Sequence, residues 1–219
     1  MQTTEPTDLA EKWGVGLEAA CCTLECTNQR GLWTVIHPSL SRRVQTNDRR
    51  LQYKRLQHDV FGDTLLARTK SKRGNKYAEV FFTKFGWSRV FPMAKYGVAH
   101  EALSLLFQRD IVPPKMIVDS LKEQTLGVFK RKVSETGCHL RQTEPESPCQ
   151  MDAEGVICEL NRGSGRKMTK MKSPKLLWGD CLELESYIHS NMHLNIFELD
   201  EMTPETNMSG ETSDITTIC

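Results

Sequence analysis

Three apolar, strand-like runs in the first half of the chain, separated by polar and glycine-containing turns, predict a small antiparallel meander of three strands. Aromatic and β-branched residues, which favour a pleated and half-buried backbone, are concentrated in residues 61–69, 76–83 and 87–91. Gly74-Asn75 and Lys84-Phe85-Gly86 separate these segments and are turn signals. We expect Pro92 to end the third strand, because proline donates no ladder hydrogen bond.

Beyond the meander, helical and strand-like patterns alternate. The helical period of residues 99–109 gathers one apolar face, made of Ala99, Ala102, Leu103, Leu106 and Phe107. The apolar run 115–118 predicts a buried strand parallel to the first, and a helix, a strand and a helix are expected at 125–135, 138–143 and 152–161. The order β-β-β-α-β-α-β-α is that of the ribonuclease-H-like α/β fold, a mixed five-stranded sheet with flanking helices.

Residues 7–27 predict a smaller helical module ahead of this sheet. Two short helices are interrupted at Gly14-Val15-Gly16, as in a helix-turn-helix, and Asp8 is placed to cap the first of them. The second helix carries acidic residues and no cation, so packing or protein contact is favoured over reading of a DNA groove. We expect four segments: a helical module at 1–28, a basic linker at 29–55, the ribonuclease-H-like core at 56–195 and an acidic tail at 196–219.

Composition narrows the class of protein. The chain has 219 residues, of which 38% are hydrophobic, so a packed core is expected. No run approaches the roughly 18 apolar residues of a membrane helix, and the N-terminus resembles no secretory signal, so no membrane partner is expected. The eight cysteines form no C-x-x-C pair, which favours neither a zinc ribbon nor a disulfide framework and fits a reducing compartment.

The net charge of +1 is unevenly divided. No Lys or Arg follows Lys175, so residues 1–175 hold 29 basic and 19 acidic residues. A basic body with an acidic tail favours a polyanionic partner such as nucleic acid, although an ordinary solvated surface explains the same imbalance. Five cations that follow Glu154 are the candidate phosphate contacts, with a solvated helix face as the alternative: Arg162, Arg166, Lys167, Lys170 and Lys172.

Three carboxylates are candidates for a metal site. Asp63 lies in the first predicted strand, Asp119 ends the apolar run 115–118, and Glu154 follows 35 positions later near the start of a helix. Carboxylate oxygens suit Mg²⁺ or Mn²⁺, and two ions roughly 3.5–4 Å apart clamp the attacking and leaving oxygens of phosphoryl transfer. The competing acidic residues nearby are Glu123, Glu144, Glu146 and Asp152.

Six blocks of the sequence resemble the integrase region of Ty1/copia-type retrotransposon polyproteins, most closely the copia-like elements of diatoms and oomycetes. In order they are LAEKWGVGLEAA, GDTLLARTKSKRGN, RVFPMAKYGVAHEAL, VPPKMIVDSLKEQT, TEPESPCQMDAE and the stretch from ELNRGSGRKM to LLWGDCLELE. The resemblance covers nearly the whole chain. It implies a ribonuclease-H-like integrase core in which Asp63, Asp119 and Glu154 form the DDE active site.

The resemblance also implies the reaction and its partners. Two Mg²⁺ or Mn²⁺ ions would serve DNA 3′-end processing and strand transfer. The partners would be the element's DNA ends and the target DNA, with a homo-oligomer as the active form. The nucleus is the expected location, and cytoplasmic retroelement particles are a second one.

The chain departs from the family pattern at several positions. Met151 stands where the family has Asn, and Gly179 where it has Asp. The pair His189 and His193 lacks paired cysteines and is interpreted as one helix face rather than a zinc site. Because the chain ends at Cys219 without a reverse transcriptase, we expect a fragment or a decaying copy of a polyprotein. The alternatives to an active enzyme are a catalytically dead, nucleic-acid-binding remnant and an inactive structural relic.

Overall fold

The computed structural model describes residues 4–29, 33–34, 58–110, 112–118, 127–143, 148–196, 199, 202–212 and 215. The chain divides into two compact units. The smaller consists of Met1–Gln45, Phe85–Trp87 and Tyr187–Cys219, and the larger of Thr46–Lys84 and Ser88–Ser186. This division differs from the four expected segments, because the expected acidic tail belongs to the same unit as the N-terminal helices.

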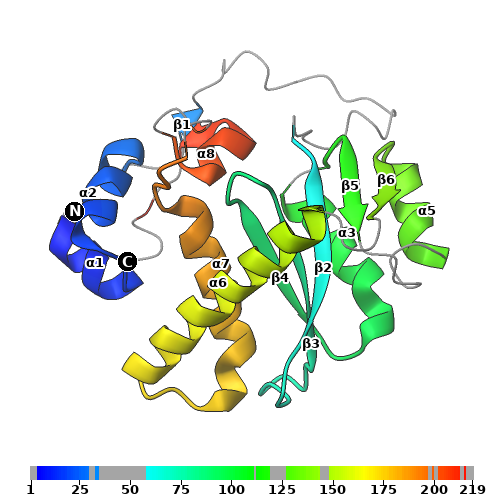
Figure 1. The fold of residues 1–219 in the computed structure, drawn as a ribbon, viewed down its shortest axis with the longest axis horizontal. Coiled ribbons are helices and arrows are strands. Elements are labelled where there is room, and N and C mark those ends of the chain that lie inside the picture. The colour runs from blue at the N-terminus through cyan, green and yellow to red at the C-terminus, as the bar shows by residue number, and fades with distance from the viewer. Residues whose placement is uncertain are drawn as a thin grey trace. The chain divides into compact units, whose positions relative to one another are not determined.

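The larger unit contains a five-stranded sheet of order β4-β3-β2-β5-β6 (Figure 1). Its strands are β2 Val60–Leu66, β3 Tyr77–Phe82, β4 Ser88–Met93, β5 Lys115–Val118 and β6 His139–Gln142. The first three form the predicted antiparallel meander. β5 pairs in parallel with β2, as predicted, and β6 pairs in parallel with β5. The mixed sheet of the predicted fold is therefore confirmed.

The prediction that Pro92 ends the third strand is wrong. β4 continues to Met93, and Pro92 lies opposite Ala78 of β3 in the register. β4 is at the edge of the sheet and has a neighbour on one side only. An edge strand tolerates proline because the missing N–H need not remove a ladder hydrogen bond.

Helices flank this sheet. α3 Ala99–Arg109 has the predicted bounds, and α5 Gly127–Glu135 packs against it. α6 Pro148–Lys170 crosses β2, and α7 Trp178–Asn191 follows it (Figure 1). A buried core joins the sheet to Leu160 of α6 and Leu182 of α7; its strand members are Phe61, Ala78, Val80, Phe82, Val90 and Ile117. Burying these side chains provides the main driving force for folding of the larger unit.

α6 is much longer than the helix predicted at 152–161, and it continues through Gly163 and Gly165 although glycine is a weak helix former. A methyl group at Gly163 would overlap the Glu185 carboxylate of α7. That carboxylate is buried and forms an ion pair with Lys167 of α6. Gly163 thus permits the close approach of Glu185, and the pairing compensates the cost of burying its charge.

The smaller unit contains the two predicted N-terminal helices, α1 Pro6–Trp13 and α2 Leu17–Cys26. Gly14 lies between them with φ +67°, a left-handed conformation that favours glycine. α1 begins at Pro6, so Asp8 is in its first turn and does not cap it. The core of this unit consists of Leu9, Trp13, Ala20, Ile188 and Ile215.

Segments from both ends of the chain pair within the smaller unit. β1 Trp33–Thr34 pairs antiparallel with β7 Glu211–Thr212, and α8 Pro204–Ser209 precedes β7. The backbone N–H of His193 donates to Thr23 Oγ1 of α2 at 2.9 Å. The described residues of the expected tail are therefore part of a packed unit. Among the residues described, no helix has the length and apolar character to cross a membrane.

Candidate functional site

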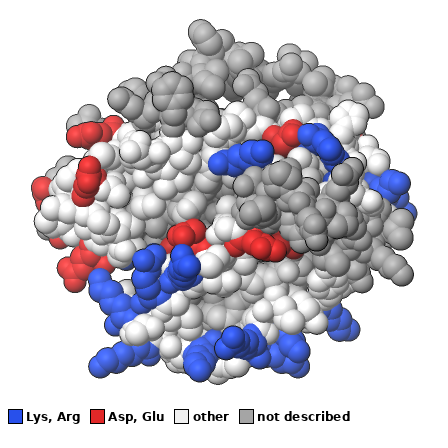
Figure 2. Space-filling view, viewed as in Figure 1, with Lys and Arg blue, Asp and Glu red and all other residues white. Residues whose placement is uncertain are grey.

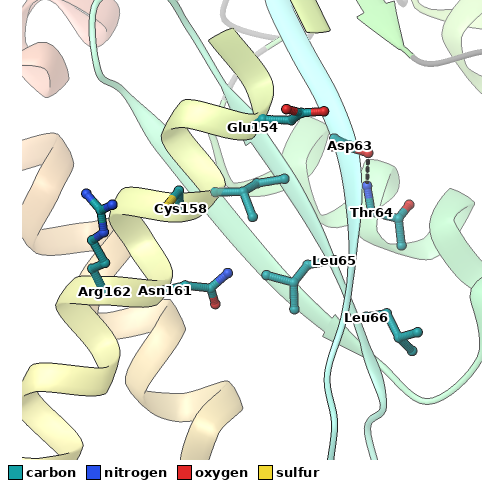
Figure 3. A pocket seen from close by; sticks show the side chains of 9 residues that line it. Asp63, Thr64, Leu65, Leu66, Glu154, Cys158, Asn161 and Arg162 are labelled. Atoms are coloured by element: carbon teal, nitrogen blue, oxygen red, sulfur yellow. Dashed lines mark hydrogen bonds between the residues drawn. The ribbon is translucent and has the colours of Figure 1, made fainter. Parts of the chain in front are cut away.

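Asp63 lies in the middle of β2. Alternate residues of a strand share a face, so Asp63 shares its face with Phe61 and Leu65, which belong to or pack on the core beneath α6. The Asp63 side chain is half-buried, and its Oδ1 accepts a hydrogen bond from the Thr64 backbone N–H at 2.7 Å (Figure 3). The strand thus presents a carboxylate next to the helix, with one oxygen held by a backbone donor.

Glu154 lies in the N-terminal half of α6, and its side chain is exposed. It lines the same open pocket as Asp63, between β2 and α6, with a volume of about 630 Å³. In Figure 3 the Glu154 carboxylate extends toward the strand that carries Asp63. The other residues that line this pocket are Thr64, Leu65, Leu66, Ile157, Cys158, Asn161 and Arg162. Two of the three predicted catalytic carboxylates are therefore brought together.

The third, Asp119, lies outside the described residues. The strand before it is described, and Val118, the last residue of β5, is the register partner of Gly62. The chain neighbours of Asp63 and Asp119 are thus paired across two parallel strands. A Cβ added to Gly62 would lie 3.3 Å from Val118 Cγ1, so the two strands are tightly packed at this point.

The structure does not test the four competing acidic residues. Glu123, Glu144 and Glu146 lie outside the described residues, and Asp152 belongs to α6 without a described side chain. In the described part of the chain, no group of three or more His, Cys, Asp or Glu side chains is arranged to hold a metal ion. Asp63 and Glu154 nevertheless fit hard divalent cations such as Mg²⁺ or Mn²⁺, since both offer carboxylate oxygens at an open pocket.

The two histidines singled out in the sequence are separated by the end of a helix. His189 lies in α7, which ends at Asn191, so His193 lies beyond it and the expected shared helix face is wrong. The Nδ1 atom of His189 is 2.8 Å from the carbonyl oxygen of Gly86. Among the described residues, neither histidine belongs to a group of three or more His, Cys, Asp or Glu side chains that could hold a metal ion.

The five predicted phosphate contacts differ in their surroundings. Arg162 lines the pocket, is 67% exposed and forms a 3.4 Å ion pair with Glu159. Arg166, Lys170 and Lys172 are exposed. Lys167 has a side chain only 16% exposed and forms its ion pair with Glu185, so it is engaged within the fold. Four of the five thus lie at the surface, and Figure 2 shows basic side chains over the C-terminal part of α6.

Cys158 and Asn161 are pocket residues that the sequence interpretation missed. They follow Glu154 by four and seven positions, the spacing that returns to one face of a helix. Glu79 of β3 was also missed: its side chain is fully buried, and its Oε2 accepts a hydrogen bond from Thr64 Oγ1 at 2.7 Å. Helical spacing from Glu154 would have identified the first two, whereas no local pattern indicates Glu79.

Comparisons with known proteins give no match to a protein-family model and none to a curated protein. Among the solved structures that share the fold are two viral integrase structures. The catalytic core domain of BIV integrase aligns with a TM-score of 0.53 and 13% identity over 67% of this chain and 90% of that one. The simian T-cell lymphotropic virus intasome, in complex with the PP2A regulatory subunit B56 gamma, aligns with a TM-score of 0.54 and 14% identity. That alignment covers 68% of this chain and 53% of the intasome chain. The likeness confirms the predicted fold, the ribonuclease-H-like arrangement of an integrase catalytic core.

Proposed function

We propose that this chain is the integrase catalytic core of a Ty1/copia-type retrotransposon polyprotein and that it carries out DNA 3′-end processing and strand transfer. One observation carries the proposal: Asp63 on a strand and Glu154 on a helix, far apart in the sequence, line one open pocket. The integrase-core fold and the six sequence blocks that resemble Ty1/copia elements support the same function.

Asp63, Asp119 and Glu154 would hold two Mg²⁺ or Mn²⁺ ions. When bound, such ions activate the attacking water or 3′-hydroxyl and neutralise charge that develops on the phosphate. The protein's own groups position the reactants. The Thr64 N–H fixes one oxygen of Asp63, and Arg162, at the margin of the pocket, is placed to attract a DNA phosphate.

DNA is the proposed partner, as element ends and as target. The excess of basic residues in 1–175 supports this proposal, since cations that neutralise phosphates supply most of the affinity for DNA. A homo-oligomer is the proposed active form, and one of the two structural neighbours is itself part of an intasome. The proposed location is the nucleus, with cytoplasmic retroelement particles as a second site.

A second candidate is a catalytically dead remnant that retains nucleic-acid binding. Gly179, where the family has Asp, favours it: a Cβ at this position would lie 3.3 Å from Pro92 Cγ. A side chain at this position would require Pro92 to shift by a few tenths of an ångström, so the present packing is matched to glycine rather than to the family's Asp.

A strand-transfer assay on a labelled DNA end with Mn²⁺ tests the proposal. We expect product from the unmodified chain and a loss of about 100-fold or more in Asp63→Asn and in Glu154→Gln, because each removes a metal ligand. Glu101→Gln, an exposed carboxylate on α3, is the matched control and should retain activity. Wild-type protein that binds DNA but yields no product would contradict the enzymatic proposal and favour the remnant.

A further inference from the structure

Two segments of the larger unit carry many cations and no acidic residue. Residues 64–78 contain Arg68, Lys70, Lys72, Arg73 and Lys76. Residues 160–179 contain Arg162, Arg166, Lys167, Lys170, Lys172 and Lys175. Ten of these eleven side chains are exposed, Lys167 being the exception. Three of them form ion pairs with carboxylates outside these two segments: Arg73 with Asp180, Arg162 with Glu159 and Lys167 with Glu185. The eleven cations outnumber these carboxylates, and a local excess of positive charge attracts a polyanion.

The fold brings the two segments together. The backbone N–H of Lys72, in the β2–β3 loop, donates to the carbonyl oxygen of Leu176, in the α6–α7 connection, at 2.7 Å. Arg73 of the same loop forms a 2.7 Å ion pair with Asp180 at the start of α7. The β2–β3 loop and the α6–α7 connection are therefore attached to each other at two points.

The β2–β3 loop holds its cations on a well-defined backbone. The Ser71 N–H donates to the Asn75 carbonyl oxygen at 2.7 Å, and the Asn75 N–H donates to Ser71 Oγ at 3.0 Å. Gly74 adopts φ +82°, which closes the turn. Ser71 is buried, whereas Lys70 and Lys72 on either side of it are exposed. This internal bonding fixes the backbone positions from which the lysines extend, so the loop backbone loses little entropy when it binds.

We propose that the basic platform, defined as the exposed cations of residues 68–76 and 170–175, binds the phosphate backbone of duplex DNA whose end enters the pocket. The inference rests on the proposed function and adds a contact surface to it. Figure 2 shows basic side chains along the lower edge of the molecule, where Figure 1 places the β2–β3 loop and the α6–α7 connection. These basic side chains continue the row of exposed cations on α6.

The length of α6 fixes where along the DNA this contact falls. Lys170 follows Glu154 by sixteen residues on one helix, which corresponds to about 24 Å. At a rise of about 3.4 Å per base pair, the platform would meet phosphates about seven base pairs from the reacting end. Continuity with the pocket and with the cations of α6 favours duplex DNA over an anionic membrane, although Met171 and Leu176 are exposed among the lysines.

Salt-dependent DNA binding tests the platform without any catalytic step. Binding of the full chain to a labelled duplex of about 20 base pairs is followed by fluorescence anisotropy in EDTA, over about 50–200 mM salt. The variants are Lys70→Gln/Lys72→Gln and Lys170→Gln/Lys175→Gln. In each variant the plot of log K against log salt should become less steep, by about 1.8 in slope. The reason is that two phosphate contacts are lost, each of which contributes about 0.9.

The matched control is Lys130→Gln/Arg131→Gln, which removes two exposed cations from α5 and should leave the slope nearly unchanged. Lys70→Arg/Lys72→Arg retains the charge and should restore the wild-type slope, which separates a charge effect from misfolding. Unchanged slopes in both platform variants would overturn the inference. Tighter binding to phosphatidylserine vesicles than to DNA, lost in the platform variants, would also overturn it and assign the surface to a membrane. The binding assay is run in EDTA, which removes divalent ions, so its outcome does not depend on whether the chain catalyses strand transfer. A failure of the platform inference can therefore be distinguished from a failure of the proposed function.

Discussion

The two compact units are assembled in opposite ways. The larger is nearly continuous in sequence, and its sheet consists of the strands of that one stretch, with β2 as the centre. The smaller takes its helices and its two-stranded sheet from both ends of the chain. Local periodicity therefore accounts for most of the larger unit, whereas the smaller depends on contacts between segments distant in sequence, which no local pattern encodes.

Truncating one buried aromatic side chain in each unit should give the largest effect and tests whether the two units unfold independently. Trp13→Ala in the smaller unit and Phe129→Ala in the larger each remove an aromatic side chain that is 1% exposed, at an expected cost of about 3–5 kcal/mol. Hydrogen exchange should then rise in α1, α2 and α8 for the first variant and in α5 and the sheet for the second. Equal loss of protection in both units for either variant would show that they unfold together.

Within the larger unit, two glycines of α6 give opposite expectations. Gly163→Ala should destabilise by about 1–3 kcal/mol, because the added methyl group overlaps the Glu185 carboxylate that pairs with Lys167. Gly165→Ala meets no atom within 4 Å and should stabilise by about 0.5–1 kcal/mol through helix propensity. Denaturant unfolding measures both, and stabilisation by both substitutions would show that Glu185 does not depend on Gly163.

The sequence predicted elements wherever one local rule applied. The apolar face of α3 gave both of its ends, and the run 115–118 gave β5 and its parallel pairing. Prediction from the sequence failed where tertiary contacts determine the local structure. Gly163 appears in the sequence as a helix breaker, but its role is to accommodate Glu185; Pro92 appears as a strand end, but it lies in an edge strand.

The site shows the same division. The strand order and the sequence blocks indicated Asp63 and Glu154, and the fold places both at one pocket. The burial of Glu79 beside Thr64 depends on the β2–β3 register and was not foreseen. The attachment of Lys72 to Leu176, on which the basic platform depends, joins residues more than a hundred positions apart and is likewise invisible to local periodicity.

The smallest expected effect concerns Glu183 of α7. Burial raises the pKa of its carboxyl, Asp180 adds to the rise, and Arg73 and Arg109 oppose it. Because the folded state favours the protonated acid, the stability of the wild type falls as pH rises through this elevated pKa. Glu183→Gln should therefore raise Tm at pH 7 by only about 1–2 °C, given partial solvent screening. This gain in Tm should vanish at pH values below the ordinary pKa of a glutamate carboxyl, where Glu183 is protonated in both the folded and the unfolded state. A gain in Tm that persists at low pH would contradict a charge effect.

The central claim is that three carboxylates from separate elements form one divalent-metal site, and Asp119→Asn tests it most directly. Strand transfer by this variant on a labelled DNA end should be lost, with an unchanged circular dichroism spectrum and a weakened affinity for Mn²⁺. Retained strand transfer, or Mn²⁺ affinity equal to that of the wild type, would contradict the assignment of Asp119 to the same site as Asp63 and Glu154.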